Sequence, residues 1–386
     1  MASVDSKLSI TQSAVYVGEN FAGPASDEVD RDARFPREAL GAMRETGLLS
    51  CLVPTELGGQ GASMSEVAET VRILSGYCAS TAMIYAMHQI QVACMMHHGN
   101  SEFFREYLRD LVETQPLLAS ATTEAGIGGD TRTSGCFVDT SGDKFRLEKN
   151  APVISYGQSA DAVLVTARRT EDSAPNDQVL VLCDSRGLTL DPVGEWDTLG
   201  FRGTCSLGFH LVAEGDTEMI LTDGFDVILR RTMLPVAHIL WGHVWLGIAT
   251  EAVGRARAFV RAEARKKPGI TPPAAVRLAE IVATLGQFRG LVRSAARHYD
   301  EVVDDPDALD SMAFAIEMNS VKISASTLVA EIVARTMTIC GMAGYRQDSP
   351  YSLGRLLRDS HGAAVMVNND RIIGNNAQML LVHKEL

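Results

Sequence analysis

The chain has 386 residues, of which 46% are hydrophobic and 22% charged, an ordinary composition for a globular protein with a sizeable core. Its formal net charge of −13 argues against a nucleic-acid partner, because binding a phosphate backbone requires clustered lysine and arginine. No uninterrupted apolar run reaches the roughly 18 residues of a membrane span, and the first residues do not resemble a signal peptide, so we expect a cytoplasmic protein without a membrane partner.

The first part of the chain has helical periodicity. FPREALGAMRETGLL places apolar residues at helix-like intervals behind Pro36, and the loop PTELGGQGAS separates it from two long apolar-periodic segments that end near Gly99. These patterns predict an N-terminal α-helical domain over residues 1–118.

The texture changes in the middle of the chain. KFRLEKNAPVISYG, DAVLVTARR, QVLVLCD and CSLGFHLVAEG are short, β-rich and separated by turn-forming residues, which predicts a compact β domain over residues 119–225. Helical periodicity then returns in four long segments, the last being YSLGRLLRDSHGAAVMVNNDRI, and predicts a four-helix bundle over residues 226–386. The expected fold is therefore mostly α with a small β domain.

The seven cysteines are scattered and odd in number, and none of them forms a CxxC or Cys/His ligand spacing. Free thiols in a reducing compartment are typical of this pattern, and we expect no metal site.

One short stretch, TEAGIGGDTRTS from Thr123 to Ser134, combines hydroxyl side chains with glycines. A glycine-rich segment lets the main chain approach a ligand closely because no Cβ intervenes. The stretch is therefore either a plain β-turn or a backbone cradle for a phosphate or a flavin ring.

Four patches in the correct order resemble the acyl-CoA dehydrogenase family over nearly the whole chain. They are FPREALGAMRETGLLSCLVPTELGGQGAS, the TEAGIGGDT stretch, WDTLGFRGTCS and GMAGYRQDSPYSLGRLLRDS. The resemblance implies an acyl-CoA dehydrogenase-like fold with an N-terminal α-helical domain, a middle β-barrel-like domain and a C-terminal four-helix bundle. It also implies a homodimer or homotetramer.

The resemblance implies FAD as the cofactor, with FMN as a possible replacement. The glycine-rich segment and the strand VISYG would line the flavin ring, with Ser155 beside flavin N5, and the loop TICGMAGY would contact the ADP half in a partner subunit. The implied cofactor-binding residues are Thr122, Thr123, Gly126, Gly129, Ile154, Ser155, Gly341, Gly344 and Asn369.

The chain departs from the family at the catalytic base. The family's usual glutamate position falls at Val367, and the alternative position used by some relatives falls at Ala237. Asp370 is the nearest acid, roughly one helical turn beyond Val367, although a solvated pair with Arg371 explains it equally well. His238 is the second catalytic candidate, since an imidazole can act as acid or base, but a satisfied core histidine is the competing interpretation. His361 is a weaker candidate of the same kind.

A second departure concerns the pyrophosphate contact. The family's Arg-x-x-Phe-Gly is replaced by RKKPGITPPAAV, where Lys266 and Lys267 are either phosphate contacts or a solvated helix end. A loosely held flavin suits an enzyme that receives reduced flavin from a separate reductase.

Three functions follow from these departures. The first is a flavin-dependent oxidoreductase acting as an acyl-thioester dehydrogenase, on acyl-CoA or acyl-carrier-protein substrates, with an atypical base and an electron-transfer partner. The alternative is a flavin-dependent monooxygenase or oxidase of the same fold that uses reduced flavin and O2. The third is a non-catalytic flavin- or ligand-binding protein.

Overall fold

The computed structural model describes residues 8–126 and 131–384. Its N-terminal part is helical. A capping box formed by Ser63 and Glu66 starts the helix α4 (Met64–Tyr77). A continuous, almost entirely buried helix follows Cys78 and forms the centre of this part. The helices are α1 (Ile10–Val17), α2 (Gly23–Arg31), α3 (Arg37–Glu45), α4 (Met64–Tyr77), α5 (Ala79–His98) and α6 (Glu102–Thr114), with a π-helical turn at Gly18–Ala22.

The β domain contains two sheets. In the first, β1 pairs with β4 in parallel and β4 with β5 in antiparallel fashion; the second is antiparallel, in the order β2-β3-β7-β6. Residues of β3 alternate between buried and exposed, as a half-buried strand requires. The strands are β1 (Leu118–Ala121), β2 (Val138–Ser141), β3 (Lys144–Ala151), β4 (Ala162–Arg168), β5 (Gln178–Asp184), β6 (Leu188–Val193) and β7 (Gly208–Asp216).

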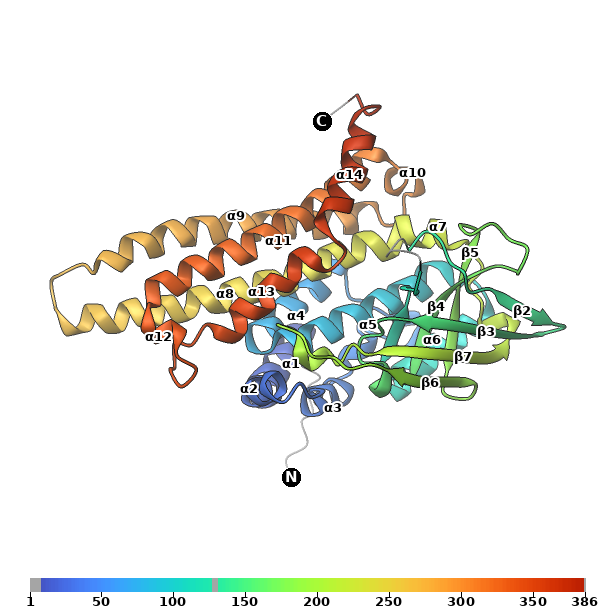
Figure 1. The fold of residues 1–386 in the computed structure, drawn as a ribbon, viewed down its shortest axis with the longest axis horizontal. Helices are drawn as coiled ribbons and strands as arrows, with labels where there is room; N and C mark the ends of the chain where they lie inside the picture. The colour runs from blue at the N-terminus through green and yellow to red at the C-terminus, as the bar shows by residue number, and fades with distance from the viewer. Residues whose placement is uncertain (1–7, 127–130, 385–386) are drawn as a thin grey trace.

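The C-terminal part is a helix bundle. Figure 1 shows its long helices side by side along the longest axis of the molecule, with the strands gathered at one end. Close approach to α4 is possible because Gly247 has no side chain: a Cβ there would lie 2.5 Å from the Cβ of Ser75. The helices are α7 (Phe225–Ile228), α8 (Leu234–Lys266), α9 (Pro273–Val302), α10 (Pro306–Leu309), α11 (Met312–Cys340), α12 (Met342–Tyr345), α13 (Gly354–Val365) and α14 (Asn369–Leu380).

Two helical stretches are long and apolar enough to cross a membrane by length and composition, Phe225–Lys266 and Met312–Cys340. The most apolar window of the first is 89% buried inside the protein, and that of the second 44%. Both are helices of the bundle, so this criterion is weak evidence for a membrane span.

The predicted architecture is confirmed, whereas two local predictions are wrong. VISYG is not a strand: β3 ends at Ala151, and Ser155 lies in a turn that leads into a 3₁₀ helix at Gly157–Ser159. The last predicted helix is also interrupted, since α13 ends at Val365 and α14 begins at Asn369. In both places the chain turns because a non-glycine residue, Tyr156 (φ 47°) or Val367 (φ 45°), adopts a left-handed conformation.

Candidate functional site

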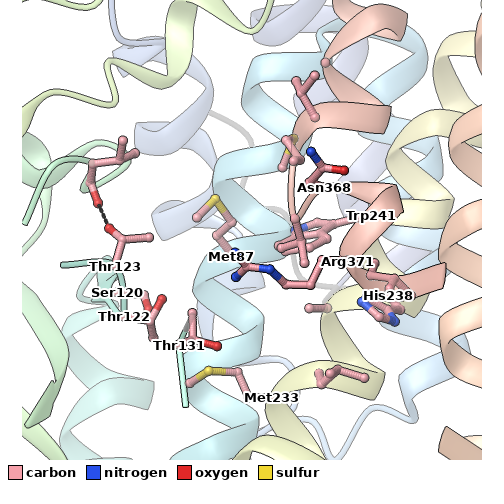
Figure 2. A pocket seen from close by; sticks show the side chains of 18 of the residues that line it. Met87, Ser120, Thr122, Thr123, Thr131, Met233, His238, Trp241, Asn368 and Arg371 are labelled. Carbon is pink, nitrogen blue, oxygen red and sulfur yellow. Dashed lines mark hydrogen bonds between the residues drawn. The ribbon is translucent and has the colours of Figure 1, made fainter. Parts of the chain in front are cut away.

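A cavity of about 1550 Å³ lies where α5, the β domain, α8, α11 and the α13–α14 region meet. Small-molecule pockets typically measure about 300–1,000 Å³, so this cavity has room for a large cofactor and a substrate together. Figure 2 shows two different walls, with Ser120, Thr122, Thr123 and Thr131 on one side and the side chains of α8 and α14 on the other.

The first wall carries hydroxyl side chains from the β domain. Thr122 and Thr123 line the cavity as predicted for cofactor contacts, and the Thr123 hydroxyl donates a hydrogen bond to the Val153 carbonyl at 3.0 Å. This bond ties the start of the glycine-rich stretch to the turn that carries Ser155. The remaining hydroxyl residues of this wall are Ser120, Thr131, Ser155, Thr198, Thr204 and Ser206.

Glu124 organises the rest of the glycine-rich stretch. Its carboxylate accepts hydrogen bonds from the Ser134 hydroxyl at 2.5 Å and from the backbone N–H groups of Gly135 and Cys136 at 2.9 and 3.0 Å. The buried ammonium of Lys149 lies 3.6 Å from the same carboxylate. Glu124 therefore has a structural role: it joins the beginning of this stretch to its end at Ser134 and to the two residues that follow.

The two glycines predicted in this stretch have different outcomes. Gly126 is exposed, has a φ of 92° that favours glycine, and does not line the cavity. Gly129 lies outside the described residues. A ring contact at either position stays a prediction.

Ser155 lines the cavity, while Ile154 is buried behind it. The turn that holds both residues is fixed by the neighbouring loop, because the N–H of Ile154 donates to the Leu207 carbonyl at 2.8 Å and the N–H of Tyr156 donates to the Thr204 carbonyl at 2.7 Å. The Ser206 hydroxyl donates to the Ser155 hydroxyl oxygen at 2.8 Å.

The opposite wall is mostly apolar and aromatic, although Arg230, Arg358 and Arg371 also line the cavity. Its side chains come mainly from α5, α8 and α11, and they would surround a substrate without offering charge: Met83, Met87, Met233, Trp241, Phe314 and Met318. Such side chains exclude water from a ligand, which strengthens the few polar contacts that remain.

His238 lines this apolar wall and is buried, and Figure 2 shows it near Trp241. Its Nδ1 lies 3.1 Å from the Met318 carbonyl oxygen. Because a carbonyl only accepts, Nδ1 carries the proton, which leaves Nε2 as an acceptor. Burial lowers the pKa of His238 to about 3, so the imidazole is uncharged near neutral pH.

Val367 and Ala237, the two positions that the resemblance predicts for the family's glutamate, both line the cavity. The Val367 carbonyl accepts a hydrogen bond from Lys322 Nζ at 2.7 Å, and the same ammonium donates to Asn369 Oδ1 at 2.7 Å. Burial lowers the pKa of Lys322 to about 8. Asn369 thus joins α14 to α11, and it does not line the cavity.

Asp370 lies in the first turn of α14, where its side chain is exposed and outside the cavity lining. Its backbone N–H donates to the Asn368 side chain at 2.8 Å. The neighbouring Arg371 and the more distant His361 do line the cavity. The structure therefore brings His238 and His361 to the cavity, and leaves Asp370 beside it.

The residues implied in the adenine half of the cofactor site do not line this cavity. Gly341 ends α11 with a φ of 53°, and Gly344 packs beneath Leu353 in the short helix α12. Lys266 and Lys267 end α8, and the Lys266 ammonium is paired with Glu263 at 2.6 Å. In Figure 1, α12 lies at the end of the bundle opposite the strands, and a cofactor contact at these residues stays a prediction.

Sequence reasoning missed the role of Asp359. This residue is buried on α13, and its carboxylate accepts a hydrogen bond from the Phe201 N–H at 2.7 Å. The contact fixes the loop that carries Thr204 and Ser206 against the bundle. The Arg-Asp pair was visible as a family motif, but nothing local in the sequence indicates its partner.

A cavity of this size, with a hydrogen-bonding wall and a largely apolar wall, has the properties of a site for a large planar cofactor and a small molecule beside it. The residues present fit a flavin, because hydroxyl and backbone groups on the β-domain side match the polar edge of its ring.

The chain belongs to the acyl-CoA dehydrogenase family. Residues 6–115 match the family's "Acyl-CoA dehydrogenase, N-terminal domain" and residues 222–367 its "Acyl-CoA dehydrogenase, C-terminal domain". The predicted family, the fold and the flavin-dependent oxidoreductase activity are thereby confirmed.

Relatives of known name agree with this assignment. The chain is 24% identical over 356 residues to the short-chain-specific acyl-CoA dehydrogenase of Clostridium acetobutylicum, covering 89% of each chain. It is 26% identical over 355 residues to the 3-(aryl)acrylate reductase of Clostridium sporogenes, again covering 89% of each.

Solved structures share the fold. FMN-bound TdsC of Paenibacillus sp. A11-2, described elsewhere as a dibenzothiophene monooxygenase, superposes with a TM-score of 0.86 at 21% identity, covering 98% of both chains. Butyryl-CoA dehydrogenase of Megasphaera elsdenii gives 0.82 at 20% identity, covering 98% of this chain and 100% of that one. The predicted cofactor, FAD with FMN as the alternative, agrees with the family and with these structures.

Proposed function

We propose that this flavoenzyme oxidises a small, largely apolar substrate and that its reaction starts from reduced flavin and O2, as in a monooxygenase. One observation carries the proposal: among the described residues that line the cavity there is no aspartate or glutamate. Removal of an α-proton from an acyl thioester requires a base at hydrogen-bonding distance from that proton. The described lining offers no carboxylate for this step.

The residues of the two walls have distinct roles in this proposal. Thr122, Thr123 and Ser155 would hold and orient the flavin ring, which supplies the redox chemistry when it is bound. The apolar side chains of α8 and α11 would exclude water and pack against the substrate. Neutral His238 would accept a hydrogen bond from a substrate O–H or N–H through Nε2, and so orient the substrate toward the ring.

An acyl-thioester dehydrogenase with an atypical base, the main function predicted from the sequence, is the function that the comparisons support, because the named relatives include acyl-CoA dehydrogenases. The monooxygenase proposal departs from it only on the absence of a carboxylate from the described cavity lining. The base of such a dehydrogenase would be His238, which lines the cavity, or Asp370, which would have to reach the cavity from the first turn of α14. Its reduced flavin would be reoxidised by an electron-transfer partner.

One anaerobic experiment separates the two candidates. The protein is saturated with FAD, a panel of acyl-CoA thioesters is added, and the visible absorbance of the oxidised flavin is followed. We expect no bleaching in this anaerobic arm. In a second, aerobic arm, we expect substrate-dependent O2 consumption once a flavin reductase supplies reduced flavin. Bleaching by any thioester in the absence of reductase would refute the monooxygenase proposal, and H238Q and D370N would then identify the base.

We further infer a cytoplasmic homodimer or homotetramer that takes reduced flavin from a reductase. Gly341 and Gly344 support this assembly, because they do not line this chain's cavity and the family resemblance places them against the cofactor of a second subunit. Light scattering of the purified protein tests the assembly, and a monomer at micromolar concentration would contradict it.

A further inference from the structure

Three hydroxyl groups form a chain within the hydroxyl-bearing wall of the cavity. Thr204 Oγ1 lies 2.8 Å from Ser206 Oγ, and Ser206 Oγ lies 2.8 Å from Ser155 Oγ. All three residues line the cavity, but Thr204 and Ser206 are each only 3% exposed, whereas Ser155 is half-buried. Ser155 is thus the most accessible end of the chain.

We propose that Ser206 and Thr204 are positioning residues that make Ser155 a hydrogen-bond donor toward the cavity, and thereby favour the oxidised form of the flavin over the reduced form. This inference rests on the proposed flavin site. It adds two residues to which neither the family resemblance nor the cavity lining alone assigns a role.

The proposal follows from counting protons. Each hydroxyl has one proton to donate. The Ser206 proton is directed to Ser155, so the bond between Thr204 and Ser206 must be donated by Thr204. Thr204 also donates to the Phe201 carbonyl at 2.9 Å, which makes its proton shared between two acceptors.

The hydroxyl proton of Ser155 has no acceptor within the chain of three hydroxyl groups. No other described side chain or backbone group accepts from Ser155 Oγ, and this hydroxyl already accepts from Ser206. Its own O–H is therefore directed away from the chain of hydroxyls, toward the cavity that Ser155 lines. A ligand that meets Ser155 is offered a donor.

This polarity distinguishes the two oxidation states of a flavin. N5 of the oxidised ring has a lone pair that accepts a hydrogen bond, whereas N5 of the reduced ring carries a proton and accepts poorly. If the ring lies with N5 at Ser155, the oxidised ring gains a bond that the reduced ring does not. The protein then binds oxidised flavin more tightly than it would with a freely rotating Ser155.

The backbone fixes the positions of the three hydroxyl groups relative to one another. Phe201 and Cys205, on either side of Thr204, have φ values of 50° and 45°, and Tyr156 beside Ser155 has 47°. Left-handed backbone at non-glycine residues costs free energy and persists only where surrounding contacts enforce it. Here the bond from the Tyr156 N–H to the Thr204 carbonyl, 2.7 Å long, joins the two strained turns directly.

The test measures affinities for oxidised and anaerobically reduced FAD, and the midpoint potential, for the full-length protein and S206A. A typical net hydrogen bond corresponds to roughly a 2- to 10-fold change in affinity. We expect S206A to bind oxidised FAD about 5-fold more weakly with little change for reduced FAD. A 5-fold change in the ratio of the two affinities corresponds to a midpoint potential about 20 mV more positive, because a tenfold change corresponds to about 30 mV for a two-electron couple.

Two further variants sharpen the test. T204V removes the distal hydroxyl at nearly constant shape. It should shift the ratio of the affinities for oxidised and reduced FAD in the same direction by a smaller factor. T204S keeps the hydroxyl and should keep the wild-type ratio. S75A is the matched control, because the buried Ser75 hydroxyl donates to the Val244 carbonyl at 2.6 Å away from the cavity. It should lower thermal stability and leave the affinity ratio unchanged.

Each outcome has a definite meaning. Unchanged affinity ratios in both S206A and T204V, with flavin bound normally by the wild type, would overturn the inference and leave the proposed function intact. A wild-type protein that binds neither form of FAD nor FMN would overturn both. If S206A fails to fold, T204V alone decides, since its ratio either shifts or does not.

Discussion

Replacing Asp359 with alanine tests how the bundle holds the hydroxyl-bearing loop of the cavity. The carboxylate accepts the Phe201 N–H at 2.7 Å, and Gly200 packs so closely on α13 that a Cβ there would lie 2.5 Å from the Arg358 carbonyl oxygen. A buried N–H left without a partner costs about 1–3 kcal/mol. We therefore expect D359A to lose about 2 kcal/mol of stability.

For a chain of this length, an unfolding entropy of roughly 2 cal/mol/K per residue makes each kcal/mol correspond to about 1 °C in Tm. D359A should thus melt about 2–3 °C lower by differential scanning fluorimetry, and its affinity for FAD should fall because Thr204 and Ser206 lie on the released loop. D359N is the control, since its carbonyl oxygen still accepts from Phe201.

The pH dependence of D359N provides an independent check. Burial raises the pKa of Asp359 to about 6, against the opposing charge of Arg355. The folded state therefore binds this proton more readily than the unfolded state, and the stability contributed at low pH is lost as the pH rises through about 6. As the pH rises from 5 to 7, the Tm of the wild type should fall relative to the Tm of D359N. The reasoning is refuted if D359N melts as low as D359A at pH 7 and the difference between wild type and D359N does not vary with pH.

Three further predictions concern the two walls and the α13–α14 connection. S155V should weaken FAD binding about tenfold and alter the flavin spectrum in a titration; unchanged affinity and spectrum would remove Ser155 from the site. Because the pKa of His238 is lowered to about 3, the affinity for a neutral substrate should be constant from pH 5 to 8, and a sharp change near pH 6.5 in a binding titration would contradict a neutral imidazole. Burial lowers the pKa of Lys322 to about 8 from 10.5, so the folded state binds fewer protons than the unfolded state between these values and gains stability as the pH rises. Thermal melts from pH 7.5 to 9.5 should show this gain in wild type and not in K322M; parallel curves would refute it.

The architecture was predictable because the signals that define it are local and repeated. Helical and strand periodicity separate three regions of the chain, and four motifs in order identify the family. Individual site residues were predictable only where a motif fixes them, as for Thr123 and Ser155, both of which line the cavity. The absence of the family's glutamate at Val367 was also visible in the sequence.

The missed features depend on contacts between distant segments or on backbone strain. Asp359 and Phe201 are 158 positions apart, and neither shows the hydrogen bond between them in its own neighbourhood. Ser155 was expected on a strand because its neighbours favour β structure, but the left-handed Tyr156 turns the chain there. Apolar periodicity likewise carries the last helix through Val367, where the strained backbone divides it.

The positions and pKa values of His238 and Lys322 bear on which reaction the cavity can support. A catalytic base works best when its pKa is near the operating pH and its lone pair faces the proton to be removed. His238 faces the cavity, but its pKa of about 3 makes it a weak base. Lys322 has a pKa of about 8, which suits a base, but its ammonium is bonded to the Val367 carbonyl and to Asn369 and does not line the cavity. Position and basicity are thus separated between two residues, and neither alone replaces the family's glutamate. A reaction that begins with reduced flavin and O2 does not need such a base, which is why the electrostatics of the described lining favour it.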